Sequence, residues 1–391
     1  MEPHGHGPRD VTGFYAVEKP DRDDNGKRFS DRQLCLTHPD VLKIVSDRVV
    51  EHAESYGNKQ GIITVSQMDN VYPCMCDTCR AQYAKDGTQV DTYIRFVNTV
   101  ADAIAEKFPK IKISTLAYNF TEESPKVVKP RPNVIVRLCH MSPSCDLDPL
   151  EDCLLNARFM DNLKKWNELS DNLYIWHYIT VFHNYLMPYP NLNAIVKDFA
   201  TYRDNGVNGM FAQGNGDGLG GDVAELKAWV VSKLMWDPYQ DAEALINEFV
   251  EEYYGPAAPA MKKYIGVQRK LAAQPNIHAS LYCHPNAGYM DAALLKKMDF
   301  ALKKAEEAAA GSPKSADRVR RERLAYLYVQ VTAPELFDPD HFPEGADPEA
   351  MLTLFEHFKS ELEHFGITRL HELEDIEVSL NRLKNKLPGS Q

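Results

Sequence analysis

The segment from Gly61 to Arg80 has the sequence GIITVSQMDNVYPCMCDTCR and indicates the fold class. It begins with the apolar, β-branched run Ile62–Val65, which predicts a short buried strand. Polar side chains follow at once, among them Gln67, Asp69 and Asn70. A strand that ends in amide and carboxylate groups is typical of α/β enzymes, which place reactive groups at the carboxyl ends of parallel strands.

The same alternation continues along the chain and predicts a parallel sheet with crossover helices. The predicted strands are Ile62–Val65, Ile111–Tyr118, Val134–Cys139, Leu173–Ile179 and Val207–Phe211. The predicted helices before, between and after these strands are Asp40–Tyr56, Thr92–Lys107, Ala157–Leu169, Leu192–Arg203 and Val223–Trp236. Neither a G-x-G-x-x-G sequence nor a Walker sequence is present, so an α/β fold of the (β/α)-barrel, TIM-like type is favoured over a nucleotide-binding sheet.

A closed barrel of this type has eight strands, and the sequence predicts fewer. We therefore expect the first strands of the barrel to be missing from the N-terminal side, where residues 1–32 are predicted to be extended. After residue 236 the spacing of apolar residues predicts helices and no strands, apart from an irregular link at Gln274–Ala287 and a Pro- and Asp-rich turn at Asp338–Asp347. The predicted helices are Asp241–Tyr254, Ala257–Ala273, Asp291–Ala310, Ala316–Leu336, Pro348–Phe365 and Thr368–Lys386. The predicted domains are a partial barrel at residues 1–236 and an all-helical C-terminal domain at 237–391.

Composition excludes some partners. The formal net charge of −12 argues against nucleic acid, because phosphate binding needs clustered Lys and Arg. No apolar run is long enough to predict a membrane segment. The many aromatic residues suit a carbohydrate-binding cleft and a large core equally well.

The candidate site consists of side chains at the predicted strand ends. Asp69 is the candidate catalytic carboxylate, as a general acid or base, and the alternative is a turn or helix cap. In the strand Leu173–Ile179, Trp176 and Tyr178 share one face and could give a sugar ring a flat apolar floor, although core packing is the alternative. The predicted substrate-binding residues are Gln67, Asn70, Tyr118, His140, Trp176, Tyr178 and Gln213.

Four cysteines form a candidate metal site. Cys74, Cys76 and Cys79 make a C-x-C-x-x-C array, and Cys35 could supply a fourth ligand for a structural zinc. Disulfides and free thiols stay open as alternatives. A redox-catalytic role is disfavoured, because the C-x-x-C is expected in a loop and not at the start of a helix. Further along, a disulfide between Cys145 and Cys153 is sterically allowed.

Several sequence strings together resemble a known family. They are QLCLTHPDV (Gln33–Val41), ITVSQMDN with CMCDTC, ISTLAY (Ile113–Tyr118), NLYIWHYITVFHNYLMPYPNL (Asn172–Leu192), NGVNGMFAQG (Asn205–Gly214), LKAWVVSKLMWDPYQD (Leu226–Asp241) and EEYYGPAAPA (Glu251–Ala260). As an ensemble they resemble a bacterial family of glycoside-hydrolase-like proteins known as a domain of unknown function. That family is similar to α-glucuronidases and includes endo-β-N-acetylglucosaminidases that act on complex N-glycans.

The resemblance implies a glycoside hydrolase that needs no cofactor for catalysis and is periplasmic or secreted. Asp69 falls on the family's acidic position, and Cys35, Cys74, Cys76 and Cys79 fall on its recurring cysteines. Endo-acting members resemble substrate-assisted retaining enzymes, in which the substrate N-acetyl group attacks and a second carboxyl protonates the leaving oxygen. Many relatives have an acidic residue where this chain has Ala212. A non-catalytic carbohydrate-binding protein, or an inactive barrel fragment, is therefore the alternative function.

Overall fold

The computed structural model describes residues 33–141, 145–216, 218–275, 277–286, 288–337 and 348–387. The predicted extended segment 1–32 lies outside these residues. The chain forms two compact units. The sheet unit comprises Met1–His140, Phe159–Trp176 and Asn205–Phe211, and the second unit comprises Met141–Arg158, His177–Asp204 and Ala212–Gln391. The predicted domain limits, 1–236 and 237–391, stay a prediction, because units defined by contacts need not coincide with domains.

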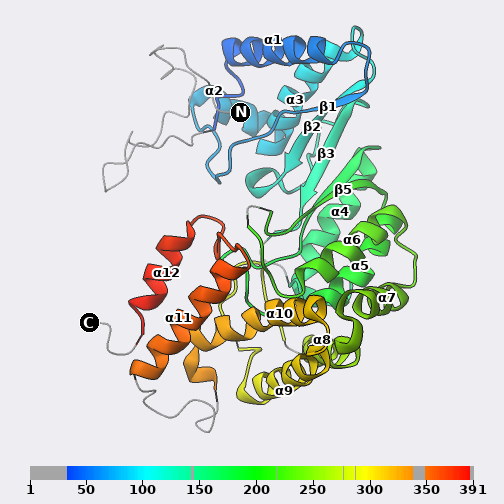
Figure 1. Ribbon diagram of the computed structural model, residues 1–391. Coiled ribbons are helices and arrows are strands. Elements are labelled where there is room, and N and C mark those ends of the chain that lie inside the picture. Colours follow the sequence, from blue (N-terminus) through cyan, green and yellow to red (C-terminus); the bar gives the residue numbers. More distant parts are fainter. Residues whose placement is uncertain are drawn as a thin grey trace. The chain divides into compact units, whose positions relative to one another are not determined.

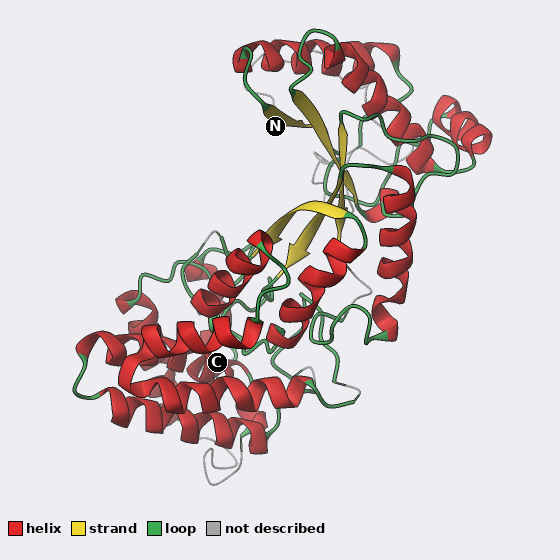
Figure 2. Ribbon diagram, turned by 90° about the vertical axis from the view of Figure 1, so that its right-hand side faces the viewer, coloured by secondary structure: helices red, strands yellow, loops and turns green. Residues whose placement is uncertain are grey.

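The sheet is a curled half-barrel of five parallel strands in the order β1-β2-β3-β4-β5, drawn in yellow in Figure 2. The strands are β1 (Gly61–Thr64), β2 (Ile111–Ala117), β3 (Val134–Cys139), β4 (Leu173–Tyr178) and β5 (Val207–Gln213). In register, Ile63 pairs with Ile113, and Arg137 pairs with Tyr174. Each strand was predicted within a few residues of these bounds. A complete barrel is not present in the part of the chain that the structure describes.

One face of the sheet is covered by helices, and the other is partly open. Helix α3 (Gln89–Ala105) packs on β2 and β3, and α1 (Pro39–Tyr56) packs on α3 and β1 (Figure 1). Ile63 points to these helices and is buried, whereas its neighbour Ile62 points to the other face and is 42% exposed. Because alternate residues of a strand point to opposite faces, this pattern distinguishes the two faces of the sheet. In a closed barrel the open face would line the interior.

The remaining helices follow the predicted periods, with two differences. The helices are α2 (Asp77–Asp86), α4 (Ala157–Leu169), α5 (Leu192–Asp204), α6 (Ala224–Trp236), α7 (Ala242–Tyr254), α8 (Ala258–Ala272), α9 (Ala292–Ala309), α10 (Pro313–Thr332), α11 (Pro348–His364) and α12 (Ile376–Lys384). Helix α2 was not predicted, because it lacks an apolar stripe. The helix predicted from Thr368 begins only at Ile376, since His371 and Glu374 form an isolated bridge before it. None of the described helices is long and apolar enough to span a membrane.

A buried carboxylate fixes the connection between β2 and β3. Asp91, in the first turn of α3, is fully buried. Its Oδ1 accepts hydrogen bonds from the backbone N–H groups of Val127 and Val128, both at 2.7 Å, and Oδ2 accepts one from Lys126 at 2.9 Å. Burial alone would raise the pKa of Asp91, but these bonds and that from the Thr88 hydroxyl outweigh burial and lower the pKa below its ordinary value.

We expect Asp91→Asn to lower the free energy of unfolding by about 2–3 kcal/mol at pH 7, because charge-assisted hydrogen bonds are replaced by weaker ones. The control is Asp102→Asn on the same helix, whose exposed ion pair with Arg131 contributes at most about 1 kcal/mol. Urea unfolding measures both. Since the pKa of Asp91 is lowered in the folded state, its stabilisation is complete above the ordinary Asp pKa and is lost as the pH falls through the lowered value. A variant equal to wild type at pH 7 would contradict this role.

Candidate functional site

The carboxyl ends of β1 and β2 bring Gln67, Asp69 and Tyr118 together. The Tyr118 hydroxyl donates a 2.8 Å hydrogen bond to Oδ1 of Asp69, which is exposed to solvent. The Gln67 side chain donates to the Tyr118 carbonyl at 2.6 Å and to the Thr121 hydroxyl at 2.9 Å. The Gln67 backbone N–H donates to the buried Tyr93 hydroxyl at 2.9 Å. Gln67 therefore ties the loop after β1 to the loop after β2, and Asp69 stays accessible.

Gln33 holds the other side of this loop, and sequence reasoning did not assign it a role. It is 5% exposed, and its Nε2 donates to the Met68 carbonyl at 2.7 Å and to Oδ1 of Asn70 at 3.1 Å. Its Oε1 accepts from the Met68 N–H at 3.0 Å. Asn70 Oδ1 also accepts from the Tyr72 N–H at 3.0 Å, which is a turn-stabilising bond. The feature that reveals this role of Gln33 is its nearly complete burial, which is visible only in the structure.

An aromatic and cationic cluster lies on the open face of the sheet. Trp176 of β4 packs edge-to-face on Phe211 of β5, with ring centroids 4.7 Å apart. The Arg137 guanidinium of β3 lies over the Trp176 ring at 5.7 Å. Phe211 is 43% exposed, and Arg137 and Trp176 are half-buried. The predicted alternation of β4 is confirmed at Ile175 and His177, which are buried. Arg137 and Phe211 were not predicted as site residues.

The other predicted residues are more deeply buried or lie in the second unit. His140 is 1% exposed and packs on Phe159 at 4.5 Å, as a core histidine would. Tyr178 belongs to the second unit, where it is buried against Phe182 at 5.6 Å. Gln213, also in that unit, accepts a backbone hydrogen bond from Ile179 at 3.0 Å. Their roles as sugar ligands stay predictions.

The four predicted cysteines converge within the sheet unit. Their sulfur atoms all lie within 4.8 Å of one another, and the Cys35 sulfur is 3.7 Å from those of Cys76 and Cys79. A tetrahedral zinc with Zn–S bonds of about 2.3 Å places its sulfurs about 3.8 Å apart, whereas a disulfide needs about 2.05 Å. All eight cysteines of the chain are free thiols in the structure, including Cys145 and Cys153, so the disulfides considered for them are not formed.

The position of the C-x-x-C differs from the prediction. Cys76 is the N-cap of α2 and Cys79 lies in its first turn, so the pair opens a helix and is not confined to a loop. The hydrogen bond from the Cys74 thiol lowers the pKa of Cys79 to about 5, against burial, and the same bond raises the pKa of Cys74. The four sulfurs are suited to hold a soft divalent cation.

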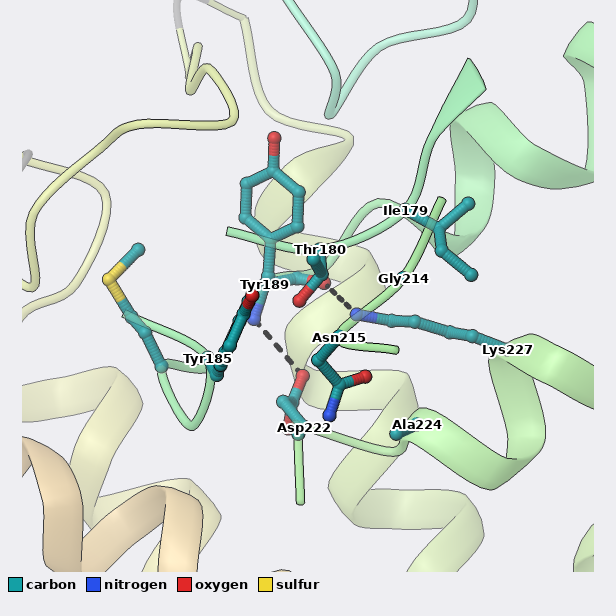
Figure 3. A pocket seen from close by; sticks show the side chains of 11 residues that line it. Ile179, Thr180, Tyr185, Tyr189, Gly214, Asn215, Asp222, Ala224 and Lys227 are labelled. Carbon is teal, nitrogen blue, oxygen red and sulfur yellow. Dashed lines mark hydrogen bonds between the residues drawn. The ribbon is translucent and has the colours of Figure 1, made fainter. Parts of the chain in front are cut away.

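A small pocket in the second unit, shown in Figure 3, was not predicted. Asp222 accepts hydrogen bonds from the Tyr189 N–H at 3.0 Å and from Tyr264 and Gln268 at 3.2 Å. The buried Lys227 donates to the Tyr189 carbonyl at 2.8 Å, and burial lowers its pKa. These bonds fix the chain before α6. Nearby, Glu225 pairs with Arg321 at 2.7 Å.

Comparison with known proteins identifies a family. A family model described as "Domain of unknown function (DUF4838)" matches residues 10–266, so the expected resemblance to such a family is confirmed. No curated protein matches the chain. A solved structure, described as a GH138 enzyme targeting pectin rhamnogalacturonan II, is similar at 12% identity with a TM-score of 0.30, over 84% of this chain and 53% of that chain. The chain thus spans about half the length of that protein. The resemblance to α-glucuronidases and endo-β-N-acetylglucosaminidases stays a prediction.

We expect Gln33→Ala to speed hydrogen–deuterium exchange of the backbone in the loop around Asp69. The Met68 N–H loses its acceptor, and the Met68 carbonyl and the Asn70 side-chain oxygen lose their donor. Hydrogen–deuterium exchange of the peptide that covers residues 66–72 should accelerate at least about tenfold, which corresponds to about 1.4 kcal/mol. The exposed Gln60, in the same unit, provides the control variant Gln60→Ala. Equal exchange in both variants would contradict the role of Gln33.

Proposed function

The chain belongs to the DUF4838 family, and we propose that it is a glycoside-hydrolase-like protein that acts on a complex glycan, with Asp69 as its main carboxylate. One observation carries this proposal. The Asp69 carboxylate is exposed at the carboxyl edge of a parallel sheet and accepts a 2.8 Å hydrogen bond from the Tyr118 hydroxyl at the end of the neighbouring strand. Catalytic groups of parallel α/β proteins occupy this edge.

The open face of the sheet supports a carbohydrate as the ligand. A sugar ring has an apolar face and a rim of hydroxyl groups. The half-buried Trp176 and exposed Phe211 offer flat apolar surface, and Arg137 over the Trp176 ring offers hydrogen-bond donors beside it. An open face that combines aromatic rings with a cation is suited to such an amphipathic ligand.

In the finer version of the proposal, hydrolysis is substrate-assisted and requires no cofactor. The N-acetyl oxygen of the substrate attacks the anomeric carbon, the Asp69 carboxylate accepts a hydrogen bond from the acetamido N–H and orients it, and a second carboxyl protonates the leaving oxygen. Tyr118 is a positioning residue, because its hydroxyl fixes the Asp69 carboxylate. Gln67 connects the loops after β1 and β2 through its side chain, and its backbone N–H bonds to the Tyr93 hydroxyl.

Non-catalytic carbohydrate binding is the second candidate. Ala212 favours it, because alanine cannot donate a proton at the position where relatives are expected to carry an acid. Glu225 is held by Arg321 and offers no evident replacement. The two candidates differ in turnover and agree in glycan binding.

We further propose that Cys35, Cys74, Cys76 and Cys79 hold a structural zinc. The spacing of their sulfurs fits a tetrahedral site, and the four ligands leave no position open for substrate. Such a site would hold the loop between β1 and α2 against the turn at Cys35. Asp69 lies in this loop, five residues before Cys74, so a metal there would stabilise the segment that presents the carboxylate.

Asp69→Asn tests the central carboxylate. With the full chain and N-glycans or glucuronoxylan as probes, we expect turnover to fall at least about 100-fold, because the amide cannot accept and orient as the carboxylate does. Glycan affinity should change less than about tenfold, and Asp47→Asn, an exposed α1 position paired with Lys43, is the control. Binding without turnover by the wild-type chain would select the non-catalytic candidate. Unchanged turnover and unchanged glycan affinity in Asp69→Asn would overturn the assignment of Asp69 as the main carboxylate of the site.

Cys74→Ser tests the four-cysteine zinc site. We expect the purified variant to lose one equivalent of zinc, measured by elemental analysis, and to have a lower melting temperature, because a structural zinc contributes folding free energy. Cys139→Ser, a buried cysteine outside the cluster, is the control and should keep its zinc. Equal zinc content in the two variants would exclude a metal at the four cysteines.

A further inference from the structure

A second group of metal-ligand side chains lies in the second unit, and no sequence motif indicated it. The donor atoms of Cys145, Asp148, Cys153 and His278 all lie within 4.8 Å of one another. Three of these residues come from the loop after β3, and His278 comes from the irregular segment after α8. The four side chains therefore come from two separate segments. Cys153 and His278 are 125 residues apart in the sequence.

The separations between the donor atoms fit the edges of a tetrahedron. The Cys145 sulfur is 3.6 Å from Oδ2 of Asp148, and the Cys153 sulfur is 3.7 Å from Nδ1 of His278. Nδ1 of His278 is 3.2 Å from Oδ2 of Asp148. With Zn–S bonds of about 2.3 Å and Zn–N and Zn–O bonds of about 2.0–2.1 Å, a tetrahedral zinc separates S from N or O by about 3.5 Å and N from O by about 3.4 Å.

The surrounding chain holds these donors in place. The buried Asn156 side chain accepts from the Cys145 N–H and donates to the Cys145 carbonyl, both at 2.9 Å. The Asp146 N–H donates to the Ala279 carbonyl at 2.9 Å, which fixes the residue after His278 beside the loop. Such bonds orient a ligating side chain, as supporting bonds do around metal ligands.

We propose that Cys145, Asp148, Cys153 and His278 form a second zinc site, which links the loop after β3 to the segment after α8. Two thiolates, an imidazole and a carboxylate are a ligand set that zinc accepts, and calcium or magnesium would require more oxygen ligands. The set is complete with four protein ligands, so the site is structural. This proposal does not depend on the proposed glycosidase function or on the four-cysteine site.

The two buried sulfurs explain why a metal fits this cluster better than a surface ion pair does. Cys145 and Cys153 are buried, whereas the His278 side chain is 40% exposed and that of Asp148 is 23% exposed. Without a metal, His278 pairs with Asp148, the Cys145 thiol donates a hydrogen bond to Asp148, and the Cys153 sulfur contacts Nδ1 of His278. A cation that binds all four donors neutralises two thiolates and a carboxylate at once.

His278→Ala is the decisive variant, because the exposed imidazole can be removed with little effect on folding. We expect the purified wild-type chain to hold two zinc equivalents, His278→Ala to hold one after dialysis against a zinc chelator, and zinc affinity at this site to fall at least about 100-fold. His284→Ala, an exposed histidine in the same irregular segment, should keep both. Cys74→Ser should lose the other equivalent, and the double variant Cys74→Ser/His278→Ala should hold none.

Two outcomes would overturn the proposal. The first is equal zinc content in His278→Ala and His284→Ala after the same dialysis. The second is a Cys145–Cys153 disulfide in the chain purified with zinc, detected by mass spectrometry of non-reduced peptides. In either case the glycan assays and the one zinc equivalent that Cys74→Ser loses relative to wild type are unaffected, so failure here is distinguishable from failure of the proposed function.

Discussion

Parallel pairing of the five strands is the constraint on which the candidate site depends. Parallel strands cannot be joined by tight turns, so each is followed by a crossover, and all carboxyl ends meet at one edge of the sheet. Asp69 and Tyr118 are 49 residues apart, yet their side chains form a hydrogen bond because each follows one of two paired strands. The register of β1 with β2, in which Gly61 lies opposite Ile111, brings these two side chains together. A shift of one residue would turn the side chains of β1 to the opposite face.

The uneven covering of the sheet has a second consequence. Helices α1 and α3 bury one face, where Ile63, Ile113 and Val136 are almost completely excluded from water. The other face keeps aromatic rings and a guanidinium at the surface, which is costly for a protein unless they contact something. Arg137 and Phe211 reduce this cost by packing on Trp176, and the remaining exposed ring surface is available to a ligand.

The strands and most helices could be predicted, because apolar periodicity reports which residues face a core. The bounds of β3 and α4 were predicted to the residue, since β3 is an almost continuous buried run and α4 has buried residues at helical intervals. Helix α2 was missed because the cysteine cluster and not an apolar stripe holds it in place. Gln33, Arg137 and Phe211 were missed because their roles arise from contacts across 35 or more residues of sequence. His278 was missed for the same reason, since no local spacing connects it with Cys153.

Each of the two cysteine clusters includes a loop that follows a strand of the sheet. The physical requirements of such loops explain why a bound metal would stabilise them. A loop at the carboxyl edge must expose polar side chains to a ligand, so it cannot be stabilised by a large apolar core of its own. Ordering its backbone nevertheless costs about 1–2 kcal/mol per residue. The loop after β1 uses Cys74, Cys76 and Cys79, and the loop after β3 uses Cys145, Asp148 and Cys153, each with one donor from a distant segment. A metal bound to four such donors, as proposed for both clusters, would replace the missing core with a few strong bonds and leave the outward side chains, Asp69 among them, accessible to solvent.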